Sequence, residues 1–139
     1  MRCVVGLMIG ILLVAGCDGG TKETASRGPF ALAGKYILKT VNGDTLPVRI
    51  QGDTVLFSDS LILSAAYTYM QWQRITTGGV SKELQAYGDF VSTLSGTDSV
   101  THVSVLRQSP SYKTYSFPIS IAGVATIAAF PFTYVYKKQ

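Results

Sequence analysis

Turn signals interrupt the chain after residue 30 at short and fairly even intervals. They are Asn42-Gly43-Asp44, Gly52-Asp53, Ser58-Asp59-Ser60, Gly78-Gly79, Gly88-Asp89, Gly96-Thr97-Asp98 and Gln108-Ser109-Pro110-Ser111. The runs between them are rich in Val, Ile, Thr, Tyr and Phe, which suit the half-buried surface of a strand. No run repeats its apolar residues with the period of a helix. The pattern therefore predicts an all-β domain, either a sandwich or a barrel.

Alternation within the runs supports this prediction. Tyr36 and Leu38 share one face of a run whose other face carries Lys35 and Lys39, as a strand with one buried face requires. Gly78-Gly79 is the clearest hairpin turn, because both positions accept a positive φ.

Residues 114–136 carry no charge, and a run of this length is long enough to span a membrane as a helix. Pro118, Gly123 and Pro131 interrupt the run, and its β-branched and aromatic residues favour two or three closing strands. A transmembrane helix and a short helix over residues 121–130 are the alternatives.

The N-terminus has the features of a secretory signal. One positive charge at Arg2 precedes the apolar run Val4–Ala15, which is too short to span a bilayer. The segment Val14-Ala15-Gly16-Cys17 resembles the lipobox of bacterial lipoproteins. The resemblance implies cleavage before Cys17, a thioether-linked diacylglycerol on its sulfur, and acylation of the new amino terminus.

This reading predicts three parts: a signal peptide over residues 1–16, the lipidated Cys17 with a flexible tether to residue 29, and a β-domain over residues 30–139. The expected location is the cell envelope, outside the cytoplasm, on either the inner or the outer membrane. The expected partners are membrane lipid, through the acylated cysteine, and the lipoprotein-processing enzymes.

The composition argues against most enzyme chemistry. The chain has 2 cysteines; Cys3 leaves with the signal and Cys17 carries lipid, so no thiol is expected for catalysis, disulfides or metal binding. His102 is the single histidine, and no Gly-x-Ser-x-Gly or phosphate-binding glycine motif accompanies it. We expect no enzyme activity, no cofactor and no metal.

The positions of the charged residues bear on nucleic-acid binding and on the role of the acids. The net charge of +4 comes from basic residues that are spread along the chain, which does not suit nucleic-acid binding. Five acids lie in or beside turn signals, and we interpret them as turn residues: Asp44, Asp53, Asp59, Asp89 and Asp98.

Three segments resemble small lipocalin-like domains of bacterial lipoproteins. They are the start Gly34-Lys35-Tyr36 with its Asn42-Gly43 turn and Leu46-Pro47, the segment Gly88-Asp89-Phe90-Val91, and the ending Phe132-Thr133-Tyr134-Val135-Tyr136 with Lys137-Lys138. The resemblance implies an antiparallel up-and-down meander that closes into a small barrel of about eight strands. Lipocalins carry Gly-x-Trp where Tyr36 stands here, and the META domain has a similar start.

A barrel of this size can hold one small apolar ligand. The candidate lining residues are Tyr36, Leu38, Met70, Trp72, Phe90 and Leu94. The alternative is that these side chains simply fill the core. The leading hypothesis is a membrane-anchored, non-enzymatic envelope lipoprotein that binds a small hydrophobic ligand. The rival is a structural or protein-interaction module of the META type.

Overall fold

A computed structural model describes residues 32–94 and 100–139, and these form ten β-strands. The strands are β1 (Gly34–Val41), β2 (Asp44–Thr45), β3 (Val48–Gln51), β4 (Thr54–Leu63), β5 (Thr68–Thr77), β6 (Val80–Leu94), β7 (Val100–Ser109), β8 (Lys113–Ser120), β9 (Val124–Ala129) and β10 (Phe132–Lys138).

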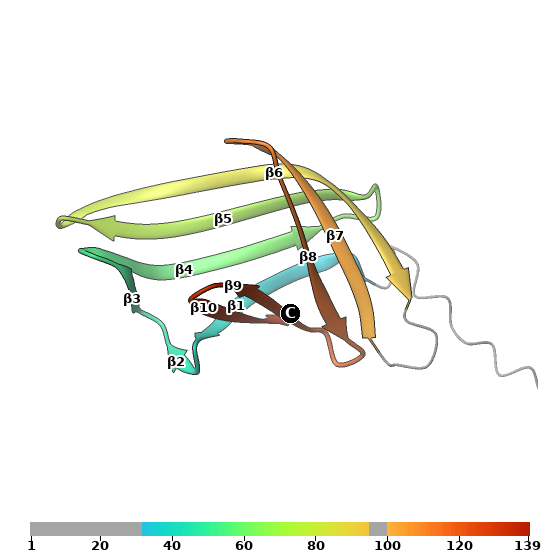
Figure 1. The fold of residues 1–139 in the computed structure, drawn as a ribbon, viewed down its shortest axis with the longest axis horizontal. Coiled ribbons are helices and arrows are strands. Elements are labelled where there is room, and N and C mark those ends of the chain that lie inside the picture. Colours follow the sequence, from blue (N-terminus) through green and yellow to red (C-terminus); the bar gives the residue numbers. More distant parts are fainter. Residues whose placement is uncertain (1–31, 95–99) are drawn as a thin grey trace, which may run out of the picture.

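The sheet is an antiparallel meander that closes on itself. From β4 to β10 each strand pairs with the next along the chain, β10 pairs with β1, and β1 also pairs with β4 through partners such as Tyr36 and Leu61. Eight strands therefore form a closed barrel, while β2 and β3 add short extensions (Figure 1). The prediction of an all-β, up-and-down barrel of about eight strands is confirmed.

The core consists of residues that alternate along the strands. Tyr36 and Leu38 are buried while Lys35 and Lys39 are exposed, as the sequence predicts. The largest fully buried side chains are Tyr36, Tyr69, Tyr136, Phe90, Phe117, Leu56, Leu61, Leu63, Ile119, Val41, Val103 and Val105. These bulky residues form the core of the barrel.

The predicted turns have mixed outcomes. Gly78 and Gly79 connect β5 to β6 with φ angles of 56° and 80°, so the predicted hairpin is confirmed. The predicted turn at Ser58-Asp59-Ser60 is wrong, because it lies inside β4. The predicted turn at Gly88-Asp89 is also wrong, because both residues belong to β6. The turn predicted at residues 96–98 lies outside the described residues.

Gly88 is required inside β6 because the neighbouring strand comes very close. A Cβ atom there would overlap the carbonyl oxygen of Leu106 and lie 2.9 Å from the Cα atom of Arg107. The register between β6 and β7 also shifts between Tyr87 and Gly88. The glycine thus serves a close backbone approach at a bulge.

The uncharged segment 114–136 contributes three closing strands, the arrangement that its prolines and β-branched residues favoured. It covers most of β8, all of β9 and part of β10, with a turn at residues 121–123 where Gly123 has a φ of 72°. Among the described residues, no helix has the length and apolar character needed to cross a membrane.

The barrel wall is incomplete between β8 and β9. These two strands share a single registered pair, Ile119 with Ala125, although β8 pairs with β7 from Lys113 to Ser120 and β9 pairs with β10 along its whole length. Figure 1 shows β8 turning away from β9 and β10. We call the separated stretches, 113–118 and 126–129, the β8–β9 seam.

Candidate functional site

A cavity of about 290 Å³ lies beside the seam, and we call it the polar cup. It is lined by Gln71, Gln73, Arg107, Lys113, Tyr115, Ile127, Ala128, Ala129, Tyr134 and Tyr136. These residues come from β5, β7, β8, β9 and β10. Because β8 and β9 supply residues on both sides of the seam, the cup is open where the wall is incomplete.

A buried carboxylate lies behind the cup. Asp59 is 2 % exposed, and its Oδ2 atom accepts hydrogen bonds from Gln71 Nε2 at 2.8 Å, Gln73 Nε2 at 2.7 Å and the Tyr136 hydroxyl at 2.7 Å. All three donors line the cup. Asp59 therefore holds three cup side chains in fixed positions through one shared acceptor atom.

The other oxygen of Asp59, Oδ1, is buried and has no hydrogen-bond partner of good geometry among the described residues. Burial raises the pKa of the Asp59 carboxyl above its usual value, and the hydrogen bonds from Gln73, Tyr136 and Gln71 oppose this rise. The neutral form is thus favoured more than in a carboxyl exposed to water.

A bulge in β4 turns Asp59 inward. The register of β4 against β5 shifts between Leu56 and Ser58, so that Phe57 and Ser58 are both exposed while Leu56 and Asp59 are both buried. An extra residue in one strand reverses the alternation that follows it. The interpretation of Asp59 as a turn residue is wrong for this reason.

Two tyrosines extend the network away from Asp59. The Tyr115 hydroxyl donates to the Tyr69 hydroxyl at 2.7 Å, which donates to Gln71 Oε1 at 2.7 Å. Their rings meet edge to face with centroids 6.2 Å apart. Burial raises the pKa of Tyr69, Tyr115 and Tyr136, so these hydroxyls keep their protons at neutral pH and act as hydrogen-bond donors.

Two cationic side chains line the other side of the cup. Arg107 donates from Nε to the Ser111 carbonyl at 3.1 Å and from Nη2 to the Ser111 hydroxyl at 3.0 Å. Lys113 is the residue directly opposite Arg107 across β7 and β8. The cup lining contains no acidic residue.

The β9 side of the cup is apolar. Ile127, Ala128 and Ala129 form it, and the ring of Tyr134 lies on the neighbouring strand β10. Small side chains at positions 128 and 129 leave room that larger residues would fill. The cup therefore combines cations, hydroxyls and amides with one apolar wall.

The six residues predicted to line a cavity are not part of the polar cup, although Tyr36 lines a second cavity described below. Tyr36, Leu38 and Phe90 are buried in the core. Met70 and Trp72 lie on the outer face of β5, 42 % and 38 % exposed, and do not point into the barrel. Leu94 ends β6, and its side chain is outside the described part, as is the whole of Cys17.

Among the described residues, no three of His, Cys, Asp and Glu come close enough to hold a metal ion. His102 is exposed on β7, and its neighbours in the strand, Thr101 and Val103, are the buried ones.

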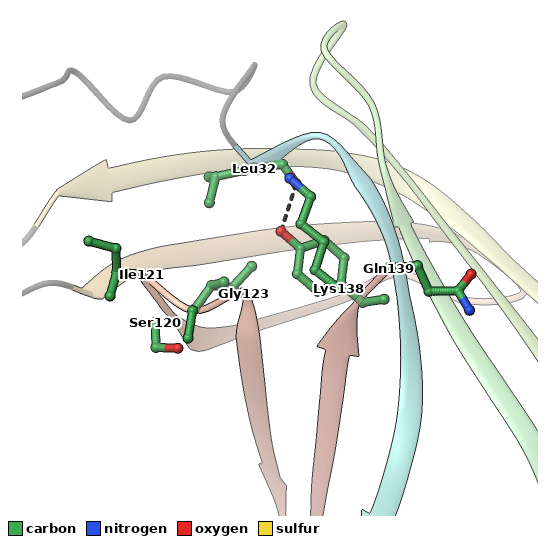
Figure 2. A pocket seen from close by; sticks show the side chains of 9 residues that line it. Leu32, Ser120, Ile121, Gly123, Lys138 and Gln139 are labelled. Carbon is green, nitrogen blue, oxygen red and sulfur yellow. Dashed lines mark hydrogen bonds between the residues drawn. The ribbon is translucent and has the colours of Figure 1, made fainter.

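A second cavity, of about 350 Å³, lies at the opposite end of the barrel, where the described chain begins. Figure 2 shows Leu32, Gly123 and Lys138 around it. The Lys138 ammonium lies 6.0 Å from the centre of the Tyr36 ring, and the Tyr36 hydroxyl donates to the Leu32 carbonyl at 2.7 Å.

Comparisons of the chain with protein families, with curated proteins and with solved structures find no match.

Proposed function

We propose that this protein is a non-enzymatic binding module, tethered by lipid to a membrane on the outer side of the cytoplasmic compartment, which holds a small molecule in the polar cup. The polar cup carries this proposal, because it joins fixed hydrogen-bonding groups to an apolar wall in one opening. Binding sites for small molecules have this combination.

The hydrogen bonds around Asp59 favour binding over catalysis. The carboxyl is buried behind Gln71, Gln73 and Tyr136, which occupy its Oδ2 atom, and its Oδ1 atom is also buried, so the group is not presented to a substrate as a nucleophile or base. Its effect is to preorganise the cup, which lowers the ordering cost of binding.

The anchor rests on the sequence. A short apolar run follows one positive charge and ends in small residues and Cys17, which resembles the lipobox of bacterial lipoproteins. Two or more acyl chains give stable anchoring, since each buried methylene contributes about 0.8 kcal/mol. The cup would then work close to a membrane surface.

Filling the cup tests the binding function. Every strand of the closed barrel lies within residues 34–138, so the chain from Asp18 onward contains the complete core. Native mass spectrometry of this protein should show a co-purifying small molecule.

Two matched variants locate the molecule. Ile127→Trp, which fills the cup, should remove the extra mass. Val91→Trp, a matched change at a residue 62 % exposed on β6, should leave it. Retention of the ligand by Ile127→Trp would overturn the proposed site.

Acyl labelling tests the anchor. The full chain produced in a bacterium that processes lipoproteins should incorporate labelled palmitate and stay in membranes at high pH. Cys17→Ser should lose the label, and a Cys17→Ser chain without residues 2–16 should be released. Membrane retention of that last chain would contradict the anchor.

A second candidate function, protein interaction, is favoured by one observation. Phe130 is fully exposed at the turn between β9 and β10 and lies beside Ile50 and Phe132. Under this alternative, Phe130→Ser would lower cross-linking of the protein to partners in intact cells, while Ile127→Trp would not.

A further inference from the structure

We propose that the ligand of the polar cup is a small amphipathic anion, whose anionic group lies between Arg107 and Lys113 and whose apolar part lies against β9. This inference rests on the proposed binding function and names the chemical class of the ligand.

The first argument is the placement of two like charges. Arg107 and Lys113 are directly opposite each other across β7 and β8, and both line the cup. Like charges in directly opposed strand positions are destabilising. In the part of the chain that the structure describes, the ion pair found joins Arg49 to Asp53. Neither Arg107 nor Lys113 forms an ion pair there. An anion between them would relieve the repulsion.

The guanidinium of Arg107 is also fixed in place. Its Nε and Nη2 atoms hold the Ser111 carbonyl and hydroxyl, which leaves the other N–H groups of the fork for a ligand. A planar fork with spare donors matches carboxylate, sulfonate or phosphate oxygens.

The carboxyl of Asp59 does not supply the missing negative charge. It lies behind Gln71, Gln73 and Tyr136, which occupy its Oδ2 atom, and it is not among the residues that line the cup. The cup consequently keeps the positive charge of Arg107 and Lys113 toward its opening.

The size of the cup and its wall define the rest of the ligand. A volume of about 290 Å³ holds roughly ten water-sized groups at about 30 Å³ each, which suits one or two rings or a short acyl chain. Ile127, Ala128 and Ala129 offer an apolar surface across from the cations. The adjoining seam allows a longer apolar part to continue out of the barrel.

Two matched fluorescent probes test the inference on the chain from Asp18 onward. The probe 8-anilino-1-naphthalenesulfonate carries an anionic group, and N-phenyl-1-naphthylamine has the same rings without it. We expect the sulfonate to bind at least about tenfold more tightly, which corresponds to about 1.4 kcal/mol. Arg107→Gln and Lys113→Gln should each weaken the sulfonate by about that factor and leave the neutral probe unchanged.

Controls separate charge from structure. Arg107→Lys keeps the charge and should recover most of the sulfonate affinity, whereas a merely structural role for Arg107 would leave this variant as weak as Arg107→Gln. Lys39→Gln removes an exposed charge on the outer face of β1 and should have no effect on either probe.

Competitors distinguish the two halves of the ligand. Decanoate should displace the sulfonate probe, while inorganic phosphate alone should not. Displacement by phosphate as effective as by decanoate would overturn the apolar half of the inference. Equal binding of both probes, unaffected by Arg107→Gln, would overturn the anionic half while the binding function stands. Failure of both probes to bind would overturn the proposed function and the inference with it.

Discussion

Asp59 is the residue on which most of the cup depends. Its Oδ2 atom is the shared acceptor for two glutamine amides and one tyrosine hydroxyl. Removal of an acceptor leaves buried donors without partners, which costs roughly 1–3 kcal/mol for each group. The same residue links the stability of the barrel to pH.

Asp59→Ala and Asp59→Asn should differ in the size of their effect on stability. We expect Asp59→Ala to lower the free energy of unfolding by about 2–4 kcal/mol, because the amides of Gln71 and Gln73 lose their acceptor. Asp59→Asn keeps an acceptor oxygen and should be near wild type at neutral pH. Urea unfolding of both variants measures this, and equal loss in both would show that the carboxylate charge itself is needed.

The pH dependence follows from the direction of the pKa shift. The pKa of Asp59 is higher in the folded barrel than its ordinary value of 3.8, so its stabilising contribution is complete below that value and is lost as the pH rises through the folded pKa. Asp59→Asn should remove this part of the pH profile of stability. An identical profile in wild type and Asp59→Asn would contradict the assignment.

Gly88 is a second residue that the barrel depends on, because the backbone of β7 leaves no room for a Cβ atom there. Gly88→Ala places a Cβ against the backbone of Leu106 and Arg107, so β6 and β7 have to move apart beside the cup. We expect a loss of about 1–3 kcal/mol, typical of overpacking. Gly78→Ala, in an open turn with φ of 56°, should cost about 1 kcal/mol. Thermal unfolding compares the two, and a smaller loss for Gly88→Ala would contradict the close approach.

At the level of elements, β5 shows why the cup was not predictable from the sequence. Its inward positions are Tyr69, Gln71 and Gln73, while Met70 and Trp72 point outward. The expectation that apolar residues face the interior therefore selects the wrong face of this strand. Gln71 and Gln73 lie two residues apart, as inward positions of a strand do, but two half-buried amides look unfavourable until their acceptor is known.

That acceptor was hidden by the bulge in β4. A strict alternation from Leu56 would place Ser58 inward and Asp59 outward, and the extra residue reverses them. Single-residue bulges have no strong sequence signal, so neither Asp59 nor its contact with Tyr136, 77 residues away along the chain, could be deduced from local pattern.

The seam gives a prediction at the level of strands. If the pairing of Ile119 with Ala125 continued, Ser116 would lie opposite Ala128. In a chain from Asp18 onward, we expect Ser116→Cys with Ala128→Cys to oxidise slowly, because strands that diverge hold the two Cα atoms beyond disulfide distance. Ser104→Cys with Ser116→Cys is the matched control, since those hydroxyls lie 2.7 Å apart across β7 and β8. Equal rates of thiol loss would show a closed wall.

For the whole molecule, the all-β class was predictable from the residues. Turn residues at short spacing and alternating runs such as Lys35–Thr40 predict a sandwich or a barrel, and the hairpin at Gly78-Gly79 follows from backbone chemistry alone. The up-and-down meander was implied by the resemblance. Closure by β1 with both β4 and β10 could be expected only from the resemblance to lipocalin-like domains, because pairing between distant strands leaves little trace in one sequence.

Closure also makes the last strand essential. β10 pairs with β1 and β9 and supplies the buried Tyr136. A chain that ends at Phe130 should therefore lose cooperative unfolding, as judged by circular dichroism during heating, because it exposes two strand edges and opens the core. A cooperative transition near that of the complete barrel would contradict this dependence.

The two cavities lie at opposite ends of strand β8. Leu32 and the turn after Ser120 lie at one end, and Lys113 with the rest of the cup rim lies at the other. Fifteen peptide steps separate Cys17 from Leu32, a reach of at most about 50 Å. If Cys17 carries lipid, the chain that leads to the lipid joins the barrel at the end opposite the cup. The molecule would then act as a receptor held within that distance of the bilayer and attached at the end of the barrel that does not bind the ligand.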